Sequence, residues 1–182
     1  MAPSGNVEWM CVPRPDGPSV FAAVLDRAAG LFRLGPTGVT VPAGRRYLPG
    51  TLVLETTWQT RTGWLIVRDA LVIGPWHHQQ HRSAIHRRPP TDDEAEHILL
   101  RTVQCIAGSV DLSLDCEPVF GYGQTPATWT YVGKEYGEAV ASGGGDDLPL
   151  WLVTELRVGF EGRGAHARTT LYEGDRAFVA LG

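Results

Sequence analysis

The 182-residue chain has few cysteines and no long apolar run, and each shortage excludes a class of protein. Its three cysteines, Cys11, Cys105 and Cys116, are an odd number without CxxC spacing. A disulfide framework needs a denser, even set, so we expect reduced thiols and a cytoplasmic protein, with a Cys105–Cys116 bridge between strands as the alternative. No uncharged apolar stretch approaches the roughly 18 residues of a membrane span. The start, Met1-Ala-Pro-Ser-Gly, lacks the basic and apolar regions of a signal peptide.

Positive charge and catalytic motifs are also scarce. The net charge of −4 and the pI near 5.8 give no general attraction to nucleic acid or to an anionic membrane. The sequence contains no GxSxG, no P-loop and no GxGxxG. Gly121-Tyr-Gly123 is too short for a dinucleotide fingerprint. Because an independent enzyme must carry its chemistry somewhere, we predict that this chain has no complete active site and no cofactor.

Turn formers are plentiful, with 22 glycines and 13 prolines between short apolar runs. The best hairpin begins where Leu52, Leu54, Thr56 and Trp58 alternate on one face, which is the period of a strand. A turn at Thr60–Gly63, with a positive φ expected for the glycine, leads into a partner strand over Trp64–Ile73.

Several other segments carry the same alternation. His97–Ala107 and Val110–Cys116 are predicted to form a second hairpin around Gly108-Ser109. Ser19 can cap a short helix over Val20–Ala29 that Gly30 ends. Further strands are expected at Val7–Val12, Leu31–Leu34, Trp129–Val132, Glu138–Ala141, Leu150–Phe160, Ala165–Tyr172 and Ala177–Leu181. About ten strands and one short helix predict an all-β fold, a two-sheet antiparallel β-sandwich that forms a single domain over residues 1–182.

The segment Gly74–Glu96 shows no core pattern and is long for a loop, so it is either functional or mobile. It contains the basic residues and histidines His77, His78, His81, Arg82, His86, Arg87 and Arg88. His78 and His81 are able to share one metal, but the regular structure and supporting hydrogen bonds of zinc sites are missing, so we predict no metal. A solvated loop is the simpler interpretation. The sharper one is a basic loop that meets an anion or an acidic surface of a partner domain.

Carboxylates offer no better site. A glycosidase needs two of them on opposite sides of the scissile bond. Asp92-Asp-Glu94 and Asp146-Asp147 lie in separate loops without a shared scaffold, which favours simple solvation. Asp69 lies inside an apolar strand and is interpreted as a buried polar anchor rather than a catalytic group.

Six tryptophans leave two alternatives open. Exposed rings on a β-sandwich stack on sugars, which would make the chain an independent carbohydrate-binding module. Four of the rings, however, fall within strand patterns, which favours packing in the core or against another domain. The six are Trp9, Trp58, Trp64, Trp76, Trp129 and Trp151.

A family resemblance supports the second alternative. The stretch Gly5–Phe21, with its Val-Glu-Trp-Met-Cys-Val-Pro-Arg core, resembles the start of the N-terminal domain of glucoamylase-type glycoside hydrolases (family fifteen). That family includes bacterial glucoamylases, glucodextranases and actinobacterial trehalases, and the similarity to mycobacterial trehalases is strong. Further matching motifs are Arg45–Trp58, Gly63–Asp69, Glu96–Val103, Cys116-Glu-Pro118 and Glu173–Ala180.

The resemblance implies a β-sandwich of the super-sandwich type, followed by a helical linker and an (α/α)6 barrel. In this family the barrel carries two catalytic glutamates and hydrolyses trehalose or related α-glucosides to glucose with inversion. No residue here matches those glutamates, so the resemblance predicts a non-catalytic domain that supports and positions the barrel, its partner. Family members usually begin earlier, with a segment that contributes strand, so we expect an unfilled sheet edge and self-association.

Overall fold

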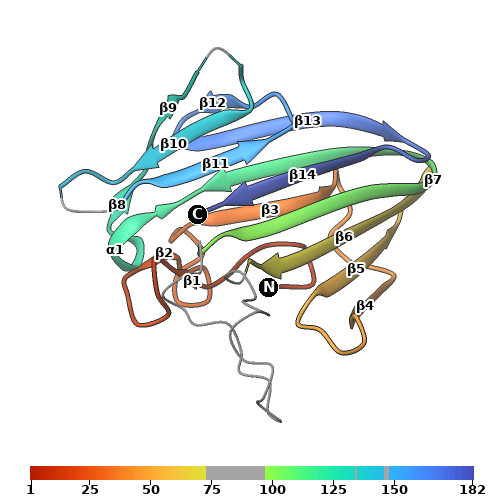
Figure 1. Cartoon of the computed structure of the whole chain (residues 1–182), viewed down its shortest axis with the longest axis horizontal. Coiled ribbons are helices and arrows are strands. Elements are labelled where there is room, and N and C mark those ends of the chain that lie inside the picture. The colour runs from red at the N-terminus through yellow and green to blue at the C-terminus, as the bar shows by residue number, and fades with distance from the viewer. Residues whose placement is uncertain (73–96, 134, 146–147) are drawn as a thin grey trace, which may run out of the picture.

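Long antiparallel strands make up most of the computed structural model, which describes residues 1–72, 97–133, 135–145 and 148–182 (Figure 1). They form two sheets that share one strand. The large sheet comprises, in spatial order, β4 (Gly44–Tyr47), β5 (Leu54–Gln59), β6 (Gly63–Leu71), the first half of β7 (Leu99–Glu117), β14 (Arg176–Leu181), β11 (Leu150–Thr154), β10 (Glu138–Ser142) and β9 (Thr128–Tyr131). The small sheet comprises β3 (Leu31–Pro36), the second half of β7, β13 (Gly164–Tyr172) and β12 (Gly159–Glu161).

The remaining elements are short and lie at one end of the sandwich (Figure 1). β1 (Met10–Cys11) pairs with β2 (Ser19–Phe21) as a separate ribbon. The helix α1 (Phe120–Gly123) leads into β8 (Thr125–Pro126). The observed all-β sandwich confirms the predicted fold class. No helix among the described residues is long and apolar enough to cross a membrane.

The strand β7 belongs to both sheets, and here the predicted second hairpin was wrong. Leu99–Gly108 pairs with β6 and β14, whereas Ser109–Glu117 pairs with β3 and β13. The two halves therefore do not pair with each other. Figure 1 shows β7 running to one end of the sandwich and returning in the other sheet. The bend falls at Gly108, where φ is +68° and an added Cβ would collide with the carbonyl oxygen of Thr62.

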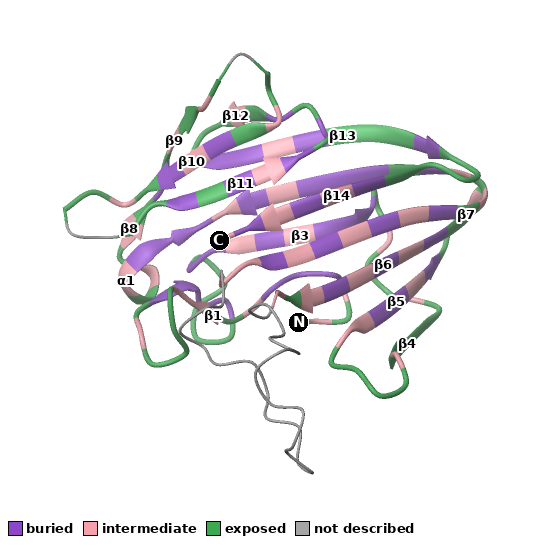
Figure 2. Ribbon diagram, viewed as in Figure 1, coloured by how far each residue is buried: buried purple, intermediate pink, exposed green. Residues whose placement is uncertain are grey.

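The core lies between the two sheets, and burial alternates along the strands (Figure 2). Val110, Leu112, Leu114 and Cys116 all point inward and are buried, as their spacing predicts. They meet inward-facing residues of the large sheet, namely Trp58, Leu65, Val67, Val103, Leu150, Leu152, Val179 and Leu181. Each fully buried aliphatic side chain contributes about 1.5–3 kcal/mol to folding.

The first predicted hairpin is confirmed as β5 and β6, with Trp58 opposite Leu65. Gly63 differs from the expectation, because its φ is not positive. A glycine is required there for a different reason, since an added Cβ would collide with the carbonyl oxygen of Ala107. Gly63 therefore marks the close approach of β6 to β7 at the bend.

The predicted helix over Val20–Ala29 was wrong. Ser19–Ala23 are five consecutive buried residues, and the backbone of Ser19–Phe21 pairs with Met10–Cys11 instead of forming helical hydrogen bonds. Ser19–Phe21 is a strand. The chain after it forms a turn, which is closed by a hydrogen bond of 2.7 Å from Ala22 N–H to the carbonyl oxygen of Ala29. Among the described residues, the short helix is α1, where Gly121 and Tyr122 both have left-handed angles.

All three cysteines are free, so the alternative of a Cys105–Cys116 bridge was wrong. The two thiols lie on the separate halves of β7, both in the core. At the outer edge of the small sheet, Val7 N–H donates to Phe32 O at 2.9 Å and Leu34 N–H donates to Gly5 O at 3.3 Å. The N-terminal segment thus provides hydrogen-bond partners for part of the backbone at the free edge of β3.

Candidate docking face

The outer surface of the large sheet carries a row of apolar side chains. Ala70, Leu100, Ala180 and Val153 are successive partners across β6, β7, β14 and β11. Their sequence neighbours Leu99, Val179 and Leu152 are buried in the core, and alternate residues of a strand point to opposite faces, so the row points outward. With Val140, Trp151 and Phe178, which lie beside it on the same surface, this row is called the docking face.

Trp151 is the most prominent member of the docking face. Its side chain is 48% exposed, while its neighbours Leu150 and Leu152 are fully buried. Its backbone is held in register by Gly182, which exchanges hydrogen bonds with it at 2.7 and 3.1 Å. A rigid strand thus presents a large aromatic ring, and such exposed apolar patches mark sites of protein association.

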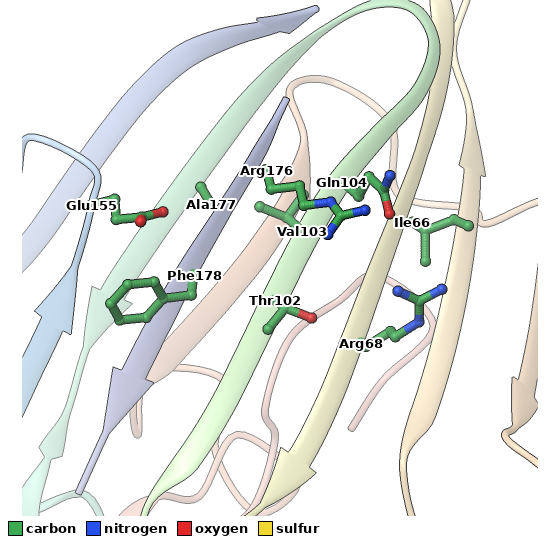
Figure 3. A pocket seen from close by; sticks show the side chains of 9 residues that line it. All are labelled: Ile66, Arg68, Thr102, Val103, Gln104, Glu155, Arg176, Ala177 and Phe178. Atoms are coloured by element: carbon green, nitrogen blue, oxygen red, sulfur yellow. The ribbon is translucent and has the colours of Figure 1, made fainter. Parts of the chain in front are cut away.

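A groove lies next to the docking face (Figure 3). Its volume is about 370 Å³, and it runs over β6, β7 and β14. The residues lining it are Ile66, Arg68, Thr102, Val103, Gln104, Glu155, Arg176, Ala177 and Phe178. Apolar walls and charged groups therefore meet in one shallow depression of the same sheet surface.

On the side of this groove nearest β5, the carboxylate of Glu55 is held between Arg46 and Arg68, an arrangement we call the charged clamp. Glu55 is 4% exposed and accepts hydrogen bonds from Arg46 Nε at 2.9 Å and Arg68 Nε at 2.8 Å. Burial acts to raise the pKa of Glu55, but the hydrogen bonds and positive charges of the two arginines prevail and hold this pKa below its usual value. One carboxylate thus serves two guanidinium groups, and the net charge of the trio is positive.

The outer surface of the small sheet has the opposite character. Its side chains are polar and bind one another: Arg33 donates to Ser113 Oγ at 2.8 Å, and Thr170 donates to Asp111 at 2.7 Å. Burial lowers the pKa of Arg33, an effect that Asp115 opposes. A surface of this kind is suited to water, so the two outer surfaces of the sandwich are clearly different.

The acidic residues of this polar surface do not form a hydrolytic pair. Asp115 and Glu117 lie two positions apart on β7, so they point the same way rather than facing each other across a bond. Asp115 Oδ1 lies 2.9 Å from His166 Nδ1, and Glu117 accepts from Arg163 Nε at 3.1 Å. Within the described residues, no three His, Cys, Asp or Glu side chains are arranged to hold a metal ion.

The tryptophans divide between the core and the surface. Trp58 is fully buried, and Trp129 stacks on Phe160 with 5.9 Å between ring centroids. Trp9 is 44% exposed and lies 6.4 Å from Tyr122, but the two rings are tilted by 39°. A sugar-binding platform needs nearly coplanar exposed rings, so this pair does not favour the carbohydrate-binding alternative.

The predicted loop site lies outside the described residues. This applies to His77, His78, His81, Arg82, His86, Arg87 and Arg88, to Trp76, and to the acidic residues Asp92, Asp93, Glu94, Asp146 and Asp147. A role of the loop in binding an anion or a partner domain therefore stays a prediction. Asp69 is described, and it is the buried anchor that its apolar surroundings predict, since it accepts from Arg101 Nε at 2.7 Å.

Sequence reasoning did not identify which face of the sandwich carries this surface, although a signal for it exists. Leu150-Trp-Leu-Val153 and Ala177-Phe-Val-Ala-Leu181 are unbroken apolar runs. A strand with one wet face alternates, whereas a strand covered on both faces is apolar throughout. These two runs, which lie side by side as β11 and β14, indicate that something covers the outer surface of the large sheet.

Comparison with known proteins gives related sequences. Residues 1–87 match a family model described as trehalase-like, N-terminal. The Trehalase of Mycolicibacterium smegmatis is 65% identical over 181 residues, which cover 98% of this chain and 27% of that protein. The Trehalase of Mycobacterium tuberculosis is 61% identical over 184 residues, which cover 100% of this chain and 27% of that protein.

A more distant relative and the solved structures complete the comparison. Trehalase 1 of Sulfolobus acidocaldarius is 35% identical over 71 residues, covering 39% of this chain and 12% of that protein. No solved structure gives a significant match. The chain thus spans about a quarter of the length of the two mycobacterial relatives.

Proposed function

We propose that this chain is the non-catalytic N-terminal domain of an α,α-trehalase, because residues 1–87 match the trehalase-like N-terminal family model and the whole chain is similar to mycobacterial trehalases. In this proposal the domain supports and positions a separate catalytic part, an (α/α)6 barrel. That barrel hydrolyses trehalose to glucose in the cytoplasm, with inversion at the anomeric carbon.

The docking face is the observation that carries the proposal. Trp151 is 48% exposed on the outside of a rigid sheet, and Phe178 and the apolar row beside it are partly exposed. This chain covers 27% of each mycobacterial relative, so most of the length of those proteins lies outside the matched part. Packing that further polypeptide against the docking face buries the apolar row and leaves the polar surface of the small sheet in solvent.

The charged groups agree with a supporting role. Asp69 is occupied by Arg101, Glu55 by Arg46 and Arg68, and Glu117 by Arg163. Carboxylates neutralised in this way are poorly suited to general acid or base catalysis, which requires a free group close to the reacting atoms. We therefore propose that this chain by itself releases no glucose from trehalose.

A chimera tests the proposal. The 182-residue chain replaces the matching part of the Mycolicibacterium smegmatis Trehalase, and glucose release from trehalose is measured. We expect the chimera to be active and the catalytic part alone to be inactive or unstable. Amide hydrogen exchange in β11 and β14 should be slower in the chimera than in the 182-residue chain, because packing protects the docking face.

Matched aromatic substitutions identify the surface involved. Trp151→Asp should lower the activity and melting temperature of the chimera, since it places a charge in an apolar interface. Tyr172→Asp is the control, because Tyr172 is 64% exposed at the end of β13 on the small sheet. Equal effects of the two substitutions, or unchanged exchange in β11 and β14, would contradict the proposed docking face.

A further inference from the structure

We propose that the groove between Arg68 and Arg176 binds a carboxylate side chain of the polypeptide that covers the docking face. This contact would align the two parts, and the inference rests on the proposed function. The groove is continuous with the docking face, because Phe178 belongs to both. A partner that packs on the apolar row is therefore brought directly over the groove.

Hydrogen-bond donors from three strands line this groove (Figure 3). Thr102 is the cross-strand partner of Arg68, and Gln104 is the partner of Arg176. Figure 3 shows the Arg176 guanidinium and the Gln104 amide over β7, with the Thr102 hydroxyl on the same strand, while Arg68 extends from β6 toward β5, where its Nε donates to Glu55. Such a set of donors is complementary to a group that only accepts hydrogen bonds, as a carboxylate does.

Within the described part of the chain, the two arginines use few of their donors. Arg68 gives its Nε to Glu55, and its two terminal nitrogens have no partner among the described residues. Arg176 makes no ion pair or side-chain hydrogen bond with any residue in the described part of the chain. A guanidinium binds a carboxylate through two parallel hydrogen bonds, which gives geometric specificity as well as attraction.

The walls of the groove favour a protein side chain over a small free anion. Ile66 and Phe178 supply apolar surface next to the charges, which suits the methylene groups of an aspartate or glutamate. Glu155 also lines the groove, beyond Phe178, and it weakens the attraction for a freely diffusing anion. A carboxylate delivered by a docked surface needs no such attraction from a distance, since apolar packing already holds it in place.

Zero-length cross-linking in the chimera described above tests this inference. The chain has a single natural lysine, Lys134, so Arg176→Lys introduces a nearly unique amine into the groove. A water-soluble carbodiimide activates carboxylates and joins them to an amine in direct contact through an amide bond, with loss of water. We expect mass spectrometry to show residue 176 joined to an aspartate or glutamate outside residues 1–182. Arg168→Lys on the small sheet is the control and should couple only to acids of this chain.

The outcomes separate this inference from the proposed function. Slow exchange in β11 and β14 without a cross-link from residue 176 to the other part would overturn the inference alone. A cross-link from residue 176 only to Glu155 would do the same. Fast exchange in those strands, with no cross-link, would overturn both. A second variant, Arg176→Gln, should keep the slow exchange and make the activity of the chimera less dependent on salt concentration, because it removes a charge pair.

Discussion

Arg101 on β7 and Asp69 on β6 form an ion pair in the core, with 2.7 Å between Nε and Oδ1. The Arg101 side chain is fully buried, and its remaining nitrogens donate to Gly5 O at 2.7 Å and Phe32 O at 3.1 Å. Its guanidinium also lies 4.8 Å from the centre of the Phe32 ring. One side chain thus connects the large sheet, β3 and the N-terminal segment.

We predict that Asp69→Ala strongly destabilises the domain, because it leaves the Arg101 charge buried without its partner. Removing one member of a buried ion pair costs about 3–5 kcal/mol. Urea unfolding followed by fluorescence measures the change. The surface pair of Arg27 and Glu8, with 2.6 Å between nitrogen and oxygen, is the comparison, and Arg27→Ala should cost less than about 1 kcal/mol. Similar losses in the two variants would show that Arg101 does not need Asp69.

The clamp on Glu55 predicts a pH dependence. The folded-state pKa of Glu55 is lowered, so its contribution to stability is present above the unfolded-state pKa and is lost as the pH falls through the folded-state pKa. The difference in unfolding free energy between the natural chain and Glu55→Gln should therefore be largest at neutral pH and shrink in acid. Urea titrations from pH 7 to pH 3 would measure it, and a difference independent of pH would contradict the clamp.

The cysteines should differ in reactivity. Burial raises the pKa of the Cys116 thiol, and it also raises that of Cys105, where Asp175 and Glu173 add to the effect. Since the thiolate is the reactive form, neither thiol should react with a colorimetric disulfide reagent at pH 8 while the chain is folded. Cys11 is partly exposed and should react first. Rapid reaction of all three thiols in the folded chain would contradict the buried positions of Cys105 and Cys116.

The bend of β7 predicts the effect of two glycine substitutions. Gly108→Ala should destabilise the domain more than Gly174→Ala, although both glycines have positive φ. A left-handed conformation costs alanine about 1–2 kcal/mol at either site. At Gly108 the new Cβ also collides with the Thr62 carbonyl, and this overpacking adds about 1–3 kcal/mol to the cost. At Gly174 no atom lies within 4 Å of the new Cβ. Thermal unfolding compares the variants, and equal losses would show that the bend tolerates a side chain.

Self-association of the isolated chain, which the sequence predicts from an unfilled sheet edge, also remains a prediction, and from the structure we expect the docking face to cause it. Static light scattering should show a mass that increases with concentration. Trp151→Arg should reduce this increase, while Tyr47→Arg, a change at an exposed aromatic residue of edge strand β4, should not. A constant monomer mass over the concentration range would contradict the prediction.

The sequence predicts those parts of the fold that local patterns determine. The alternation from Val110 to Cys116 gives the inward face of β7 correctly, and Asp69 is recognisable as a buried anchor from its apolar neighbours. The pairing of the two halves of β7 was not predictable in the same way. Gly108-Ser109 is an equally good turn in a hairpin and at a bend between sheets, and only the long-range partners β3, β6, β13 and β14 distinguish these cases.

The wrong prediction of a helix and the failure to locate the docking face have related reasons. The run from Ser19 to Ala23 is apolar at nearly every position, and a short apolar run does not distinguish a buried strand from a buried helix. The run at β11 is apolar on its outward side as well, where Trp151 is 48% exposed. A local pattern of this kind predicts that both sides of the strand are covered, but not by what.

The sharing of β7 has a consequence for cleavage of the chain. In the large sheet, β7 lies between β6 and β14, and in the small sheet it lies between β3 and β13. If β7 were absent, neither pair of strands would be connected. A cut within β7 would therefore expose unpaired strand edges in both layers at once, and such edges invite aggregation.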